Sequence, residues 1–324
     1  MPERPSPACS CRGVNLKLRF LFAAAVVAVL AFVPSPVAAQ AGTLPQGVAA
    51  VTLAWQYIDN TGHRVSDGTF IEVGQSISTG LLFEMDYGVT DRFSATVGIP
   101  YIFAKYTGGV PPPFIPYLPV DTCQCWHSSF QDISLTARYR LGDDPWAVTP
   151  FVRYVQPSHD YDYRGEAVVG RNLRELQVGV NASARLVNLL PKAGVQAGYT
   201  YSSVQKILDF PNDRSNVFAS IGYAATSRLF LHADANWQRT HGGLRFGSPS
   251  GDPCVSPCDV NTPELLHEHD RMLRDNYWHV GGGLSYSFGP FDVFASTSKY
   301  VSGTDTHNGQ AYTAGMTWYF DLSK

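Results

Sequence analysis

The sequence has few charged residues and no excess of basic ones. Only 16% of its 324 residues are charged, and 24 Lys and Arg stand against 27 Asp and Glu, which gives a net charge of −3. Proteins that bind nucleic acid carry a basic patch or stripe. We therefore expect no nucleic-acid partner.

Long apolar runs are missing after the first forty residues, so no segment there reaches the ~18 residues that a membrane-spanning helix needs. The apolar run at 20–33 has 14 residues, follows Arg12, Lys17 and Arg19, and precedes the small residues at 37–39. This order predicts a secretory signal peptide over residues 1–39; a retained signal anchor is the alternative. Cleavage removes four basic residues and one acidic residue, which moves the net charge from −3 to −6.

What the sequence does contain is strict alternation, and residues 309–320 (GQAYTAGMTWYF) show it best. The face defined by alternate positions is apolar and consists of Tyr312, Ala314, Met316, Trp318 and Phe320. A period of two indicates a β-strand with one apolar face. Aromatic side chains that face outward at the end of a strand are typical of the boundary between water and lipid.

Eleven more segments alternate in the same way: 48–58, 76–87, 93–103, 129–141, 147–156, 172–187, 193–204, 215–224, 228–240, 275–288 and 291–301. The connections near 89, 143, 190, 226 and 289 are short, and those near 65, 115, 163, 209, 257 and 305 are mostly longer. Outer-membrane barrels have short periplasmic turns and longer outer loops, and only helices and closed barrels cross a bilayer.

No shift in composition divides residues 40–324, so we expect one domain. The predicted fold is all-β, a transmembrane antiparallel up-and-down barrel of twelve strands in the outer membrane of a Gram-negative envelope. Its expected partners are the lipid bilayer of that membrane and the outer-membrane assembly machinery.

A family resemblance is carried by two parts of the chain. Residues 87–102 (YGVTDRFSATVGIPYI) resemble a strand–turn–strand signature of the outer-membrane β-barrel transporter-like family of the meta-pathway of phenol degradation, and 278–320 is similar to its closing hairpins. The resemblance implies a barrel that passes small, often hydrophobic or aromatic, compounds, and it brings no catalytic residues. The chain departs from the usual barrel ending because 321–324 follow Phe320.

Charged residues on the faces opposite the apolar stripe are the candidate lumen residues: Glu84, Asp86, Asp132, Arg138, Arg140, Arg153, Glu175, Arg185, His232, Asp234, His279 and Asp292. They either pair with one another and fill a narrow lumen, or line a conducting pore whose selectivity they set. Because both signs are present, we predict a weak charge preference.

Four cysteines lie in the two longest outer loops, Cys123, Cys125, Cys254 and Cys258. An exported compartment favours disulfides. Cys254 and Cys258 have the spacing for a bridge within one loop. Cys123 and Cys125 are too close for an easy bridge, so one of them is expected to pair with the other loop instead. Four cysteines allow three connectivities.

We weighed a zinc site that adds a nearby histidine, His127, His267 or His269, to these cysteines. The spacings C-x-C and C-x-x-x-C do not match the usual zinc pattern. We predict no metal and no cofactor.

The last long loop contains a helix-start signal at 262–264, with Thr262 as the N-cap and Pro263 at the first helical position. We predict a short helix here that rests on the barrel mouth or folds into it.

The predicted function is passive permeation of small molecules through an outer-membrane channel or transporter. The alternative is a structural or interaction barrel with a closed lumen and outer loops that bind a partner. We expect no enzyme, because we find no convincing pairing of a Ser with a His on one strand face, and an acyl-transfer site needs such a pair.

Overall fold

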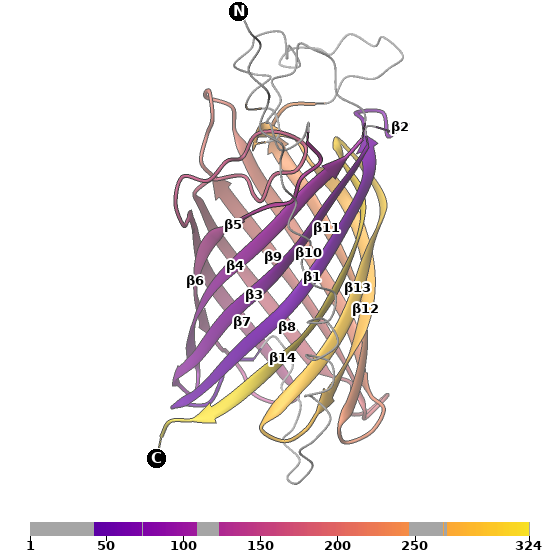
Figure 1. Ribbon diagram of the computed structural model, residues 1–324. Coiled ribbons are helices and arrows are strands. Elements are labelled where there is room, and N and C mark those ends of the chain that lie inside the picture. The colour runs from indigo at the N-terminus through magenta and orange to yellow at the C-terminus, as the bar shows by residue number, and fades with distance from the viewer. Residues whose placement is uncertain (1–41, 73, 109–122, 246–267, 269–270, 324) are drawn as a thin grey trace, which may run out of the picture.

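The computed structural model describes residues 42–72, 74–108, 123–245, 268 and 271–323. Its strands form one antiparallel sheet that closes on itself (Figure 1). Closure joins the first long strand, β1 (Val48–Arg64), to the last, β14 (Thr306–Asp321), in a register that begins with Val48 opposite Asp321. In Figure 1 the indigo and yellow strands run side by side along this seam.

The other strands follow in chain order: β2 (Phe70–Ile71), β3 (Gln75–Thr90), β4 (Phe93–Thr107), β5 (His127–Phe130), β6 (Asp132–Tyr139), β7 (Trp146–Pro157), β8 (Glu175–Arg185), β9 (Ala193–Val204), β10 (Asn212–Ala224), β11 (Leu229–Gly242), β12 (Asn276–Ser287) and β13 (Phe291–Thr304). β5 and β6 both pair with β4 and form one interrupted strand, and the two-residue β2 pairs with the end of β1. Twelve strands therefore make up the wall, which confirms the predicted barrel.

The interruption between β5 and β6 lies opposite Pro100 of β4. β4 pairs with β6 up to Gly98 and with β5 from Tyr101 onward. Proline has no N–H to give to a ladder, and here its carbonyl accepts a 2.9 Å bond from the N–H of Gln131. Gln131 is the extra residue of a bulge, which the alternation of residues 129–141 does not reveal.

The two ends of the barrel differ in their connections. One end, which we call the turn end, carries the short connections 91–92, 140–145, 186–192, 225–228 and 288–290. The other, the loop end, carries 65–74, 108–126, 158–174, 205–211 and 243–275. The exception at the loop end is the single residue Asp305, which joins β13 to β14 with a φ of 54°. Aspartate tolerates this left-handed conformation better than most residues.

Apolar side chains cover the outside of the wall. Leu53 is 49% exposed, Val178 52% and Leu135 55%, whereas inward neighbours such as Thr149 and Ser202 are fully buried. Exposing so many large apolar side chains to water would be costly, and burying them in hydrocarbon is favourable. The molecule is therefore an outer-membrane barrel, with its apolar band against lipid.

Aromatic pairs occur near both ends of this outer face. Trp237 and Trp278 lie 6.2 Å apart between ring centroids toward the loop end, and Phe291 and Trp318 lie 5.9 Å apart toward the turn end. These positions are those of the two aromatic girdles expected at the membrane–water interfaces. None of the helical segments in the described ranges is long and apolar enough to cross a membrane.

Candidate functional site: the lumen and its cap

The lumen wall from β3 to β8 carries the best-paired charges. Arg138 donates to Asp86 at 2.6 Å, and the hydroxyl of Thr96 donates to the other oxygen of Asp86 at 3.0 Å. Both charged side chains are less than a fifth exposed. Such a pair is satisfied within the wall, so it narrows the lumen without presenting a free charge.

A second ion pair lies nearer the loop end, where Glu175 of β8 and Arg214 of β10 approach to 2.5 Å. In contrast, Glu84 and Arg153 face inward and form no ion pair with any described residue. These two side chains are the free charges of this wall.

Two of the predicted lumen residues are at the rim of the turn end instead. Arg140 reaches the carbonyl of Asp91 and lies 3.6 Å from Asp143, and Arg185 is paired with Asp144. Each stands at the last position of its strand or just beyond it, where the carboxylates of the 140–145 turn are the nearest partners.

The opposite wall, β10 to β14, carries aromatic rings on its inner face: Phe218, Phe230, Tyr277, His279, Phe294, Tyr300 and Tyr319. Their inward direction follows from the alternation, because their neighbours, such as Leu231, Trp278 and Val301, are exposed on the outside. Tyr277 and His279 are stacked with ring centroids 4.4 Å apart.

Glycines on adjacent strands make room for two of these rings. A β-carbon at Gly222 would collide with the ring of Phe230, and one at Gly315 would collide with Phe294. The rings therefore lie flat over the neighbouring strand. The same wall holds three more predicted residues, His232 and Asp234, which are 3.6 Å apart, and Asp292, which accepts a 3.1 Å bond from Tyr319.

A cap closes part of the lumen at the loop end. The 158–174 loop buries Tyr161, Ala167 and Val169 against the inward residues Ala104 and Tyr106 of β4. Loops normally lie on the surface, so this inward packing is the least expected feature of the site.

Tyr161 ties the cap to the wall. Its hydroxyl donates to the predicted lumen residue Asp132 at 2.5 Å and accepts from the N–H of Asn172 at 2.8 Å. Burial, followed by the hydrogen bond to Asp132, raises the pKa of Tyr161 far above its ordinary value. The phenol therefore stays protonated and the bond holds at any physiological pH.

Arg271 locks the cap to the 243–275 loop. Its guanidinium donates to the carbonyls of Arg171 and Asn172 at 2.9 and 2.8 Å and to Glu268 at 2.8 Å, and it lies 3.9 Å from the centroid of the Tyr163 ring. The residue is only 8% exposed. One side chain thus joins two loops that are about a hundred residues apart in sequence.

Asp275 anchors the other side of the cap. It pairs with Arg171 at 3.0 Å and accepts bonds from Thr306 at 2.6 Å and Gln238 at 3.0 Å. Burial alone would raise the pKa of Asp275, but Arg171, Thr306 and other nearby groups together hold it below its ordinary value. The carboxylate is therefore charged at neutral pH.

Of the predicted helix in this loop, Glu268, Arg271 and Met272 are helical, and residues 262–267 and 269–270 lie outside the described residues. The extent of the helix stays a prediction. Sequence analysis gave Arg271 no role at the loop end, because its partners Arg171 and Asn172 lie in another loop.

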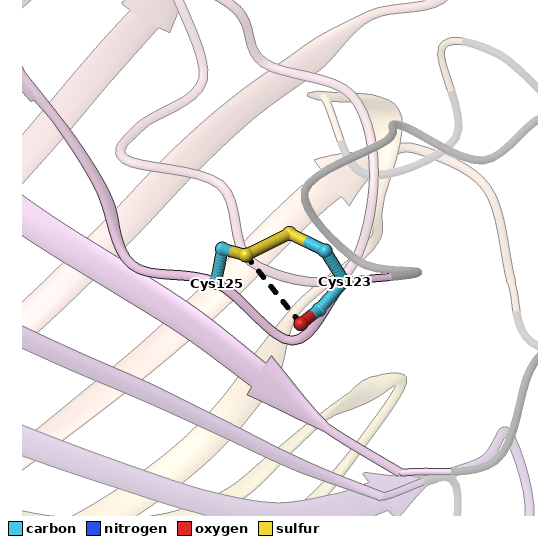
Figure 2. Close-up of a disulfide and its surroundings, with 2 residues drawn as sticks. All are labelled: Cys123 and Cys125. Atoms are coloured by element: carbon cyan, nitrogen blue, oxygen red, sulfur yellow. Dashed lines mark hydrogen bonds between the residues drawn. A yellow bond between two sulfur atoms is a disulfide. The ribbon is translucent and has the colours of Figure 1, made fainter. Parts of the chain in front are cut away.

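The cysteines are arranged differently from the favoured reading. Figure 2 shows a disulfide between Cys123 and Cys125, with the Sγ of Cys125 also 3.4 Å from the Cys123 carbonyl. Their Cα atoms are 5.2 Å apart, within the usual range for a bridge. Cys254 and Cys258 lie outside the described residues, so their bridge stays a prediction. The described residues contain no cluster of three metal-ligating side chains.

Comparison with known proteins supports the fold. No family model and no curated protein matches the sequence. The structure is similar to the COG4313 outer membrane channel from Pseudomonas putida F1, with a TM-score of 0.63 and 12% identity over 87% of this chain and 98% of that one.

Two further solved structures are similar to a lesser degree. They are the translocator domain of autotransporter NalP from Neisseria meningitidis (TM-score 0.46, 12% identity, 86% and 90% covered) and the CymD monoaromatic hydrocarbon channel (0.43, 10%, 86% and 89%). At 12% identity, the likeness to the Pseudomonas putida channel is one of fold, that of an outer-membrane β-barrel.

Proposed function

We propose that the barrel is a passive channel for small molecules that carry an aromatic or hydrophobic part. The observation that supports this most directly is the row of inward rings on β10 to β14, among them Phe230, His279 and Phe294. Apolar and aromatic solutes gain contact with such rings, while a lumen lined only by charges would favour polar solutes.

The charged wall complements the rings. The Asp86–Arg138 and Glu175–Arg214 pairs are satisfied internally, and Glu84 and Arg153 remain to contact a polar substituent. A solute with one apolar and one polar side fits between these walls. This substrate class agrees with the family resemblance described above, and the neighbour from Pseudomonas putida is itself described as an outer membrane channel.

The test is permeation into liposomes that contain the purified protein. We expect phenol to enter faster than a sugar even though both are small, and we expect Phe230→Ala together with Phe294→Ala to reduce the phenol rate severalfold while the sugar rate is kept. A matched control is Phe103→Ala, because Phe103 is 37% exposed on the outside of β4. Equal loss for both solutes would contradict the role of the rings.

The second candidate, a closed barrel that binds a partner through its loops, is favoured by one observation, the tight packing of Tyr161, Ala167 and Val169 under the loop end. The same assay separates the two. If no solute enters even when Arg271→Ala has released the cap, and the barrel is still folded, the closed barrel is the correct function.

A further inference from the structure

A cluster of polar side chains lies on the outside of the barrel toward the loop end. Asp213 and Ser215 of β10 alternate with outward Val217, and His241 of β11 stands directly across from Asp213 in the register. These side chains therefore face the membrane surface rather than the lumen. Below them on the same strands the outward residues are apolar.

Ser215 and His241 form a close pair. The Oγ of Ser215 lies 2.7 Å from the Nε2 of His241 and 3.0 Å from the hydroxyl of Tyr199. With neutral imidazole carrying its proton on Nδ1, the serine hydroxyl donates to Nε2. This is the contact by which a histidine removes the proton from a nucleophilic serine.

The surroundings of His241 favour such a transfer. The carboxylate of Asp213 is held by the Tyr201 hydroxyl and the Val204 N–H, both at 2.9 Å. Asp213 carries this charge on the residue directly across from His241 in the register of β10 with β11. Arg239, across from Ser215, is exposed and pairs with no described carboxylate, so it is free to attract an anionic group.

The outer wall on the turn-end side of the pair offers room for an acyl chain. A groove of about 730 Å³ lies on the outer face of β7 to β11, where Ala182, Ala197, Ala219 and Ala235 stand in register on four neighbouring strands, and Ala219 is four positions along β10 from Ser215. The small side chains leave a hollow that only lipid or an amphiphile reaches.

We propose that Ser215 and His241 are the nucleophile and base of an esterase site on the outer wall, and that its substrates are acyl esters presented in the membrane. The Oγ of Ser215 attacks the ester carbonyl as its proton passes to Nε2 of His241. The bond between the acyl carbon and the alcohol oxygen breaks, and the alcohol leaves with that proton. Water then hydrolyses the acyl-serine, with His241 again acting as the base.

The experiment uses the full-length folded barrel in detergent micelles. A fluorophosphonate probe is added and the labelled residue is located by mass spectrometry, and hydrolysis of a medium-chain p-nitrophenyl ester is followed in parallel. We expect the label on Ser215, and no labelling or hydrolysis in Ser215→Ala. His241→Gln lowers the hydrolysis rate at least 100-fold, which is the usual contribution of a general base.

Ser128→Ala is the matched control. Ser128 also lies on the outside and bonds a tyrosine, Tyr101, at 2.9 Å, and the hydrogen bonds described for it include none to a histidine. We expect this variant to keep full hydrolysis. An electrophoretic shift on heating shows that each variant is folded.

Two results would overturn the proposal. One is a folded protein in which Ser215 is not labelled and hydrolysis equals that of Ser215→Ala. The other is labelling and hydrolysis that do not change in His241→Gln. In either case the pair is only a structural hydrogen bond of the aromatic girdle. Solute permeation is expected to be the same in Ser215→Ala and the unsubstituted barrel, so this test is separate from that of the channel.

Discussion

At the scale of single residues, a few buried side chains hold the loop end together, and Arg271 is one of them. It satisfies two backbone carbonyls and Glu268 at once. When a substitution removes the partner of a buried polar group, that group stays buried without a hydrogen bond, which costs about 1–3 kcal/mol of stability. The effect of a substitution therefore depends on burial more than on charge.

Arg271→Ala should destabilise the cap by on the order of 3 kcal/mol. We expect faster amide hydrogen exchange in residues 158–174 and a higher solute permeability. Arg164→Ala is the control, because Arg164 also lies near Glu268, at 3.8 Å, but its side chain is 46% exposed. Exposed pairs are worth about 0–1 kcal/mol, so equal effects of the two substitutions would show that Arg271 does not lock the loops.

The Asp86–Arg138 pair in the wall supports a second residue-scale prediction. Arg138→Ala leaves a largely buried carboxylate without its partner, which costs about 3–5 kcal/mol for a buried pair. Adding Asp86→Asn should recover much of that loss in the free energy of unfolding, measured by denaturant titration in detergent. Arg92→Ala, which removes an exposed partner of Asp143, should change it by less than about 1 kcal/mol.

At the scale of elements, the strands were largely predictable and the loops were not. Alternation is a local property, so it placed strands such as 93–103 and 193–204 within a few residues of β4 and β9. Alternation did not predict the bulge at Gln131. This bulge lies opposite Pro100, a residue of another strand that has no N–H to donate. Alternation also could not show that the 158–174 loop turns inward, because the partners of that loop are far away in sequence.

The same limit applies to the candidate sites. Opposite faces of a strand can be read from the sequence, which is why Asp86, Arg138 and Glu175 were found on the inside. The pairing of Ser215 with His241 was missed because the two residues lie on different strands, and only the register of β10 with β11 brings them together.

The stability of the cap should depend on pH, because the Asp275 carboxylate holds it in place. Its folded pKa is held below the unfolded value of about 3.9. The stability it contributes is therefore present above about pH 3.9 and is lost as the pH falls through the folded pKa. We expect sugar permeation into liposomes to stay low from pH 7 to about pH 4 and to rise below it. An increase between pH 7 and 5 would mean that another group controls the cap.

At the scale of the whole molecule, the lumen holds charges of both signs and most are paired. Among the described lumen residues, Glu84 and Arg153 form no ion pair, Asp132 and Asp292 accept hydrogen bonds from tyrosines, and Asp234 is 3.6 Å from His232. We expect a weak preference for cations, seen as a small reversal potential across a salt gradient in a planar bilayer. Glu84→Gln should shift the reversal potential in the direction that indicates greater anion permeability. A strong anion selectivity in the unsubstituted channel would contradict this account.

The seam between β1 and β14 has a consequence for how the protein is made. β1 and β14 cannot pair with each other until nearly all of the chain has been synthesised, because they are the first and the last long strands of the barrel. β1 therefore lacks this partner until the end of synthesis, and closing the seam is a late event. Because β1 and β14 are the first and last long strands, formation of their pairing reports that the strands between them have also been delivered to the membrane.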